Sequence, residues 1–530
     1  MYRRRFLQSG AALVAAAAHW PPALALPSKA APPLKRLGTT QPFDFARLKG
    51  QARTLSATAY REPSAVLPPQ IANLSWDQWQ AIRFREDHSL WASEDVRFQA
   101  RFFHLGFTAR KPVRMYTVEN GMAQQLAFDP ALFDYSRSGV NPRKLPPQLG
   151  FAGFRLLFHT DWQRDIAAFQ GASYFRAVDG DMQYGMSQRG LAIDTGMAQP
   201  EEFPDFVAYY LERPAPDVST VTVYGLLDSP STTGAYRFVI SAADTVVMDI
   251  DAALYPRKVI ERVGIAPGTS MFYYDESQHR VSEDWRPAIH DSDGLQLYTG
   301  NGEWLWRPLV NPSVLRVNSY LDDGPRGFGL MQRDRNFADY EDDGVFYNRR
   351  PSVWVQPKAN WGSGAVMLVE IPASDETSDN IVAFWNPADK PQPQKELLFG
   401  YLLYWCRYNP VACKLAQVQA TRDGIGGVVG QKRQYFSWRF VVDFVGGDFA
   451  LMSADAPVES VVSATRGQIE LVSARPLAEI HGWRAMFDLR PTDESVEPIN
   501  LRLFLSLGGQ PLSETWIYQY APPPPAQRQV

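Results

Sequence analysis

Apolar and polar residues alternate along the middle of the chain. Residues 221–223, 238–240 and 246–250 carry apolar side chains at every second position, and polar turns such as Asp-Ser-Pro-Ser separate the runs. Alternation of this kind over short runs is typical of strands with one buried face. Because the runs continue to about Trp385, the pattern predicts a large antiparallel β-sandwich.

A segment near the N-terminus has a different period. Within residues 43–60, apolar side chains recur every three or four positions, at Phe45, Leu48, Ala52, Leu55 and Ala59. This spacing predicts an amphipathic helix. We expect the helix to pack across one side of the sandwich.

A polar, proline-rich stretch at residues 386–395 interrupts the alternation and predicts a linker. Alternation returns beyond it, for example at 397–405 and 435–444, and predicts a smaller, immunoglobulin-like sandwich in a chain that is all-β. The predicted divisions are a first sandwich over 43–388, a linker over 389–396, a second sandwich over 397–521 and an extended proline-rich tail over 522–530.

The N-terminus has the order of an export signal. A run of arginines from Arg3 opens a twin-arginine pattern. It is followed by an apolar run at 11–18 and then by an A-x-A cleavage signal that ends at Ala25. The apolar run is too short for a permanent membrane anchor. We expect residues 1–25 to be a twin-arginine signal peptide and 26–42 a flexible tether, and the mature chain to be periplasmic without stable membrane insertion.

Composition agrees with this picture and narrows the function. The chain has 530 residues, of which 45% are hydrophobic and 21% charged, as in a soluble globular protein of two or three domains. Its 13% of aromatic residues, together with 41 Pro and 37 Gly, favours strands and turns over helices. A net charge of −4 gives no reason to expect nucleic acid as a partner.

The sequence offers no motif for a catalytic nucleophile, a metal site or a cofactor site. The chain lacks a G-x-S-x-G elbow, a P-loop and an H-E-x-x-H motif. The glycine-rich residues 424–430 lack the strand and helix context of a dinucleotide site and predict a loop. Cys406 and Cys413 fit a small-loop disulfide or two separate thiols equally well, and no histidine cluster accompanies them.

Two acidic motifs, residues 289–293 and 376–380, stand at the ends of the stretch richest in candidate chemistry. Glycoside hydrolysis needs one carboxyl to protonate the leaving oxygen and a second for the incoming nucleophile. Asp379 precedes an apolar strand, where shielding would raise its pKa and keep it protonated, whereas Asp291 lies in a polar turn suited to an ionised carboxylate. That both aspartates cap turns remains an alternative.

Aromatic rings and polar donors cluster between the two motifs. Aromatic rings stack on sugar faces, while arginine and amide groups bind hydroxyls. Each residue alone is more typical of packing, but the cluster predicts a sugar-binding cleft. The candidate substrate-binding residues are Trp304, Trp354, Trp361, Tyr347, Arg349, Arg350, His290, which would orient Asp291, and Asn380.

Longer motifs carry a resemblance to a known family. They cover residues 171–178, 189–195, 202–206, 289–293, 300–304, 439–447 and 514–516. The chain closely resembles the osmoregulated periplasmic glucan biosynthesis family over nearly the whole mature chain, and the twin-arginine pattern points to the D branch.

The resemblance implies a galactose-mutarotase-like first sandwich, an immunoglobulin-like second domain and a homodimer. Members of the D branch are similar to inverting enzymes that act on linear β-1,2-glucan. Carried over to this sequence, the general acid falls on Asp379 and the base on Asp291.

One departure from the family affects the expected reaction. Residues 424–436 are shorter and less aromatic than the loop that covers the cleft in D-type enzymes. The acceptor is therefore either water, as in an endo-β-1,2-glucanase, or a hydroxyl of the glucan itself, as in a cyclising transglycosylase. A non-catalytic glucan-binding scaffold that assists a β-glucan synthase is the alternative of a different class.

Overall fold

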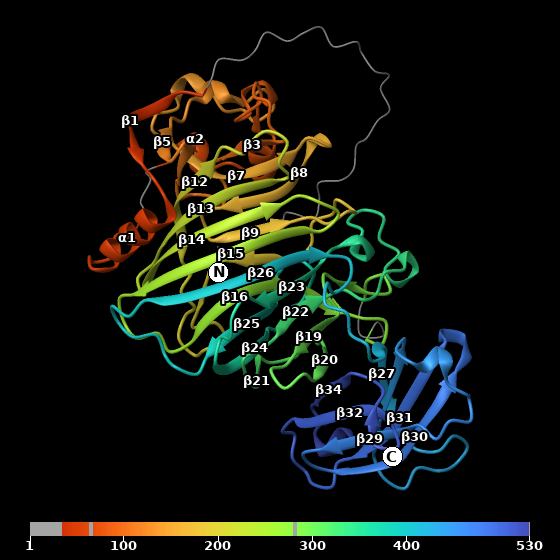
Figure 1. Cartoon of the computed structure of the whole chain (residues 1–530). Helices are drawn as coiled ribbons and strands as arrows, with labels where there is room; N and C mark the ends of the chain where they lie inside the picture. The colour runs from red at the N-terminus through yellow and green to blue at the C-terminus, as the bar shows by residue number, and fades with distance from the viewer. Residues whose placement is uncertain (1–33, 63–66, 279–282, 529–530) are drawn as a thin grey trace.

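The computed structural model describes residues 34–62, 67–278 and 283–528 (Figure 1). The predicted signal peptide, residues 1–25, lies outside the described residues, as does the first part of the predicted tether. The described end of the tether forms β1 (Arg36–Pro42), which pairs with β5 (Met122–Leu126). Residues 36–42 are therefore a strand and not a flexible tether. Backbone hydrogen bonds to the neighbouring strand hold this segment, although its sequence has no apolar period.

Two large sheets form the first sandwich and confirm the prediction of an all-β chain. The larger sheet has sixteen strands, with β33 (Gln510–Pro511) beside β32, and the smaller has ten, with β11 (Ala192–Ile193) beside β16. The order in the larger sheet is β1, β5, β4 (Arg114–Glu119), β12 (Asp205–Glu212), β13 (Thr220–Asp228), β14 (Thr232–Ser241), β15 (Val246–Pro256), β26 (Leu397–Cys406), β23 (Ser352–Pro357), β22 (Gly327–Met331), β19 (Gly294–Tyr298), β20 (Trp304–Pro308), β34 (Thr515–Tyr520), β32 (Ile499–Leu507) and β29 (Glu459–Ala464). The order in the smaller sheet is β21 (Arg316–Asp323), β24 (Ser363–Glu370), β25 (Ile381–Pro387), β16 (Val263–Ser270), β10 (Ser187–Arg189), β9 (Tyr174–Ala177), β8 (Asp161–Gln170), β7 (Phe151–Phe158) and β3 (Phe98–His104).

The remaining elements are short sheets, helices and turns. A four-stranded sheet has the order β27 (Gln417–Ile425), β28 (Trp438–Val445), β31 (Gly482–Arg490) and β30 (Gln468–Leu477), and two-stranded sheets join β17 (Phe272–Tyr274) to β18 (Ile289–His290) and β2 (Arg83–Phe84) to β6 (Phe133–Asp134). The helices and 3-10 turns are α1 (Phe45–Ser56), α2 (Pro69–Ala72), α3 (Trp76–Gln80), η2 (Glu86–His88), η3 (Pro130–Leu132), η4 (Pro142–Lys144), η6 (Phe337–Asp339), η7 (Tyr347–Arg349), η8 (Phe449–Leu451), η9 (Ala478–Ile480) and η10 (Pro525–Gln527).

The core of the first sandwich lies between the two large sheets. Phe169 and Phe175 of the ten-stranded sheet meet Phe238 of the sixteen-stranded sheet at ring-centroid distances of 5.3 and 5.2 Å. Met248 and Ile250, two of the alternating residues on β15, are fully buried in the same core. Burial of each such side chain stabilises the fold by about 1.5–3 kcal/mol, which explains why the period-two pattern predicted these strands.

Helix α1 confirms the predicted amphipathic helix. The side chain of Asp44 accepts a hydrogen bond from the amide of Arg47 at 2.7 Å and so caps the N-terminus. Leu48 and Ala52 are buried against β13, β14 and β15. The helix therefore covers part of the outer face of the large sheet, as Figure 1 shows.

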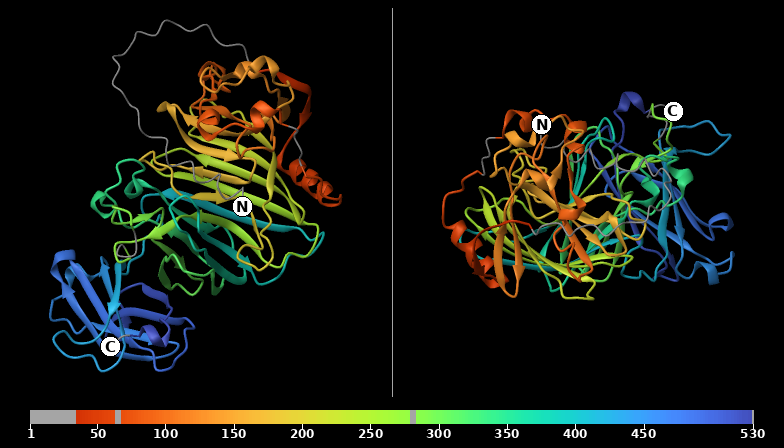
Figure 2. Two further views of the ribbon diagram at one scale, coloured as in Figure 1. Left: turned by 180° about the vertical axis from the view of Figure 1, so that it is seen from behind. Right: turned by 90° about the horizontal axis from the view of Figure 1, so that it is seen from above.

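The second, smaller sandwich forms a separate lobe at the end of the molecule away from α1 (Figures 1 and 2). Its layers are the four-stranded sheet and the strands β34, β32 and β29, which share a core that includes Phe440, Phe487 and Trp516. Strand β34 also pairs in parallel with β20, which makes one layer of this lobe continuous with the large sheet.

Strand β26 corrects the predicted boundary between the two domains. The sequence placed residues 397–405 in the second sandwich, but β26 pairs with β15 and β23 in the middle of the large sheet. The buried Tyr401, Leu403 and Trp405 complete the first core. The proline-rich residues 389–396 therefore connect two strands of one sandwich.

The two cysteines of the chain are not joined. Cys406 and Cys413 are free thiols.

The proline-rich tail is also more ordered than predicted. It contains the turn η10, and Arg528 donates hydrogen bonds to the carbonyls of Pro523 at 2.9 Å and Ser495 at 2.7 Å. The described part of the predicted tail, residues 522–528, therefore folds back onto the second lobe.

The ion pair between Arg333 and Glu514 joins the two lobes. Arg333, which follows β22, donates hydrogen bonds to Glu514 at 2.6 and 3.1 Å and to the carbonyl of Val418 at 2.8 Å. Its guanidinium lies over the ring of Trp306 at 3.5 Å. The carboxylate of Glu514 is fully buried and also accepts a hydrogen bond from the amide of Val418 at 2.8 Å. This arginine therefore contacts β27 of one layer of the second lobe and the residue directly before β34 of the other.

We expect the substitution Glu514→Ala to destabilise the protein by ~3–5 kcal/mol, because it leaves Arg333 partly buried without its partner. A fall in the thermal unfolding midpoint measures the loss. The matched control is Asp493→Asn, which removes an exposed ion pair with Arg466 and should change stability by ~1 kcal/mol or less. Equal midpoints for the two variants would contradict a role for Glu514 in joining the lobes.

Candidate active site

Three segments of the chain meet around a set of ion pairs. The segment 284–293 contains Arg286 and Asp291, the segment 332–350 contains Asp342 and Arg350, and the segment 375–380 contains the second acidic motif. Ion pairs join Arg286 to Asp342 at 2.8 Å and Asp291 to Arg350. Arg286 also pairs with a carboxylate of the third segment. Opposite charges therefore fix the three segments together.

The backbone on both sides of Asp291 is fixed. Asp291 follows β18, and its amide donates a hydrogen bond to the carbonyl of Met271 at 2.8 Å. The hydroxyls of Ser292 and Ser270 lie 2.7 Å apart, and the amide of Asp293 donates to the carbonyl of Met331 at 2.9 Å. The carboxylate of Asp291 is buried and forms an ion pair with Arg350, so its position is defined before any substrate binds.

His290 supports this segment through Gln332. Its Nδ1 atom lies 3.0 Å from the side-chain oxygen of Gln332, whose amide donates to the carbonyl of His290 at 3.0 Å. The imidazole is fully buried and stacks on Phe272 with a centroid distance of 5.3 Å. Burial lowers the pKa of His290 to about 3, so the ring is neutral near neutral pH.

Arg350 leaves the turn η7 toward the interior of the site. Phe346, directly before the turn, has a positive φ of 50°, a conformation that bulky residues rarely adopt. Arg335 holds the turn by donating a hydrogen bond to the carbonyl of Arg350 at 2.5 Å. The guanidinium of Arg350 lies 4.1 Å from the ring centroid of Tyr347. Burial lowers the pKa of Arg350 to about 9, while Glu376 and Asp379 act in the opposite direction.

Asn380 fixes the loop that carries Asp379. Its side-chain oxygen accepts from the amide of Phe272 at 2.8 Å, and its nitrogen donates to the carbonyls of Phe272 at 2.9 Å and Ile371 at 3.1 Å. Asn380, a predicted substrate-binding residue, is thus occupied with backbone groups on two neighbouring segments.

Asp379 lies among three arginines. Burial raises its pKa to about 6, in the direction expected from the sequence, while Arg189, Arg176 and Arg350 lower it. Since Arg350 also pairs with Asp291, the charge of one guanidinium acts on both predicted catalytic carboxylates. Near neutral pH, Asp379 can therefore exchange its proton. The nearby arginines stabilise the negative charge that remains when the proton leaves.

Arg176 and Arg189 are site residues that the sequence analysis did not identify. Arg189 on β10 donates to the hydroxyl of Thr269 at 3.1 Å and pairs with Glu201. Arg176 on β9 lies 4.5 Å from the ring centroid of Tyr184. Both arginines belong to motifs that carried the family resemblance, but their sequence positions gave no sign that they approach Asp379.

Glu376 is a third carboxylate of the site. It accepts two hydrogen bonds from Arg286, at 2.8 and 3.1 Å, and one from the hydroxyl of Tyr347 at 2.5 Å. Tyr347 is a predicted substrate-binding residue, but its ring is buried and its hydroxyl already has a partner. The same phenol thus contacts Glu376 and lies beneath Arg350.

Comparison with known proteins identifies the family. The family model described as periplasmic glucan biosynthesis protein, MdoG, matches residues 43–520. The chain belongs to this periplasmic glucan biosynthesis family. The resemblance found in the sequence motifs is therefore confirmed.

Curated relatives extend over the full length of the chain. Glucans biosynthesis protein D of Xanthomonas campestris pv. campestris (strain B100) is 59% identical over 535 residues, which cover 100% of each chain. The proteins of the same name from Stenotrophomonas maltophilia (strain R551-3) and Xylella fastidiosa (strain M23) are each 59% identical, cover 99% of this chain, and are covered over 98% and 99% of their own lengths. All three relatives are named glucans biosynthesis protein D, which is the branch that the sequence indicated.

The three predicted tryptophan platforms lie in the cores of the two lobes. Trp304 and Trp354 stack on each other at 5.8 Å between the lobes, and Trp354 has no exposed surface. Trp361 packs against Trp385 and Tyr401 in the first sandwich. A sugar cannot stack on the fully buried indole of Trp354, and Trp304 is buried as well, whereas Trp361 is only partly buried and its predicted role stays a prediction.

Arg349 belongs to the surface part of the turn η7. It is exposed, and its guanidinium lies 4.5 Å from the ring centroid of Phe346. Of the eight predicted substrate-binding residues, Arg350, Tyr347, His290 and Asn380 lie in the network around the two acids.

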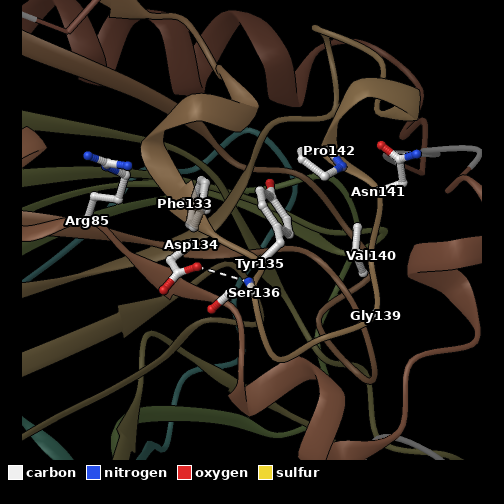
Figure 3. A pocket seen from close by; sticks show the side chains of 9 residues that line it. All are labelled: Arg85, Phe133, Asp134, Tyr135, Ser136, Gly139, Val140, Asn141 and Pro142. Atoms are coloured by element: carbon white, nitrogen blue, oxygen red, sulfur yellow. Dashed lines mark hydrogen bonds between the residues drawn. The ribbon is translucent and has the colours of Figure 1, made fainter.

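A separate pocket of about 580 Å³ opens beside β6 (Figure 3). Asp134 supplies the one carboxylate of its lining, and Arg85 and Tyr135 also contribute. An oxygen of Asp134 accepts a hydrogen bond from the amide of Ser136 at 2.9 Å. This pocket lacks the pair of carboxylates that cleavage of a glycosidic bond requires.

Two features are absent from residues 34–62, 67–278 and 283–528. No helix there is long and apolar enough to span a bilayer. No three His, Cys, Asp or Glu side chains of the same residues are grouped so that they could hold a metal ion.

The substitution Asp379→Asn should stabilise the folded protein at pH 8 and not at pH 4. Because the folded-state pKa lies above that of the unfolded chain, the stability contributed by Asp379 is complete below about pH 4 and is lost as the pH rises through about 6. The variant avoids this loss, which amounts to ~1–3 kcal/mol at pH 8. Thermal unfolding midpoints at the two pH values measure it. A variant less stable than the parent at both pH values would show that burial does not penalise the charge.

Proposed function

We propose that the protein is a periplasmic enzyme that cleaves linear β-1,2-glucan with inversion of the anomeric carbon. Asp379 acts as the general acid and Asp291 as the general base. The single observation that supports this best is the contrast between the two carboxyls around Arg350. The pKa of Asp379 is raised to about 6, whereas Asp291 forms a direct ion pair with the arginine.

The proposed reaction follows from that contrast. Asp379 gives its proton to the glycosidic oxygen as the bond from this oxygen to the anomeric carbon breaks. Asp291 accepts the proton of the attacking hydroxyl, which forms a new bond on the opposite face of the sugar. The negative charge left on Asp379 is stabilised by Arg176, Arg189 and Arg350.

The acceptor is water or a hydroxyl of the glucan itself. The loop between β27 and β28 is the segment in which the chain departs from the family. Hydrogen bonds within its own lobe hold the base of this loop. The amide of Gly427 donates to Asp488 at 2.7 Å, and Arg433 donates to the carbonyl of Gly426 at 2.8 Å. Val429 at its tip is 94% exposed. The short loop with its exposed tip is the departure from the family that keeps a hydroxyl of the glucan among the proposed acceptors.

Export, partner and assembly complete the proposal. Membership of a periplasmic family agrees with the pattern that begins at Arg3, so we infer export by the twin-arginine route. The substrate is a neutral polymer, which suits a chain with a small net charge. We also infer a homodimer, on the family resemblance alone.

We expect Asp379→Asn to lower turnover of linear β-1,2-glucan by a factor of about 100 or more, because it removes the proton donor. New reducing ends and product masses are followed together. Products that gain one water per cut identify hydrolysis, and products without reducing ends identify cyclisation.

The matched control is Asp375→Asn, which changes a neighbouring exposed carboxylate on the same loop and should retain activity. Normal turnover by Asp379→Asn would refute the assignment. A wild-type protein that binds the glucan and leaves it unchanged would identify the non-catalytic scaffold instead.

The pH profile should show an alkaline limb near pH 6. Burial raises the pKa of Asp379 to about 6, and only the protonated form donates to the leaving oxygen. In the free enzyme, kcat/KM should therefore fall about tenfold for each pH unit above that value. A profile that stays flat from pH 5 to pH 9 would exclude Asp379 as the acid.

A further inference from the structure

A large exposed ring lies next to the network that holds Glu376. The indole of Trp285 is 65% exposed, and Trp285 directly precedes Arg286 in the chain. An indole exposed beside a polar site offers a flat apolar face on which the ring of a ligand can stack.

The backbone that directly follows Trp285 is held by hydrogen bonds. The amide of Arg286 donates to Asp284 at 3.0 Å, and the carbonyl of Arg286 accepts from the hydroxyl of Tyr274 at 2.8 Å. The guanidinium of Arg286 adds hydrogen bonds to Asp284, Asp342 and Glu376. The exposed ring therefore extends from a rigid support, which lowers the entropy cost of using it to bind.

Chain geometry limits how far this ring lies from the two acids. Trp285 is six residues from Asp291, a separation of at most ~20 Å for an extended chain. Trp285 is also near Asp379 along the chain contacts. Its neighbour Arg286 binds Glu376, which lies three residues before Asp379. A polymer bound at the carboxylates can thus reach Trp285 within a few sugar units.

We propose that Trp285 is a stacking platform for a glucose ring of the linear glucan, at a subsite away from the bond that is cleaved. The apolar face of a pyranose packs on an indole, and the partly exposed carboxylate of Glu376 lies close enough to accept from sugar hydroxyls. This inference rests on the proposed function, because it takes the same glucan as the ligand.

The test measures binding without turnover. Linear β-1,2-glucan is titrated by calorimetry into the Asp379→Asn protein and into the same protein carrying Trp285→Ala or Trp285→Phe. We expect about tenfold weaker binding with alanine, equivalent to ~1.4 kcal/mol, and a smaller loss with phenylalanine, which keeps a ring. The matched control is Leu321→Ala, which shortens another exposed apolar side chain on the edge strand β21 and should leave the affinity unchanged.

Kinetics on the otherwise intact enzyme provide the second readout. Trp285→Ala should raise KM for long glucan about tenfold with kcat within about twofold, and the rise in KM should disappear for oligomers too short to reach the ring. Because the indole is exposed, the thermal midpoint should not change.

The outcomes separate this inference from the proposed function. Equal affinity and equal KM with and without the Trp285 ring would overturn the stacking platform and leave the proposed function standing. Absence of glucan binding in every variant, including the one with Trp285 intact, would overturn the proposed function itself.

Discussion

The buried guanidinium of Arg350 is the group on which the arrangement of the candidate site depends. A charge removed from water is tolerated only when opposite charges and hydrogen bonds surround it. Burial lowers the pKa of Arg350 to about 9, and Glu376 and Asp379 counteract part of this shift, while Asp291 pairs with it directly. Because these carboxylates come from two loops far apart in sequence, the charge of one arginine links the electrostatics of both loops.

This arrangement stores unfavourable free energy at the site. Phe346 is held at a positive φ of 50°, a strain of about 1–3 kcal/mol for a residue with a side chain. The same turn directs Tyr347 inward and leaves Arg349 exposed. Burial also penalises the charged form of Asp379. The large sandwich core, built from two sheets, offsets both costs, so the site depends on the stability of the whole lobe.

The sequence predicted features that depend on local pattern and missed those that depend on long-range pairing. Helix α1 and the inward residues of β15 followed from period alone. Strand β26 did not, because alternation shows that one face is buried and not which sheet the strand joins. The raised pKa of Asp379 followed from its place before a strand, whereas the opposing effect of Arg176 and Arg189 comes from strands of the same sheet that are distant in sequence. The Asp291 and Asp379 roles remain predictions.

The second lobe is connected to the candidate site through a short chain of contacts. A side-chain oxygen of Asp293, two residues after Asp291, accepts from the amides of Arg333 at 2.7 Å and Asp334 at 3.0 Å. The side chain of the same Arg333 binds the buried Glu514 of the second lobe. A displacement of Glu514 would therefore move Arg333 and then the turn that positions Asp291. The second lobe thus helps to define the geometry of the carboxylates even though its core is separate from theirs.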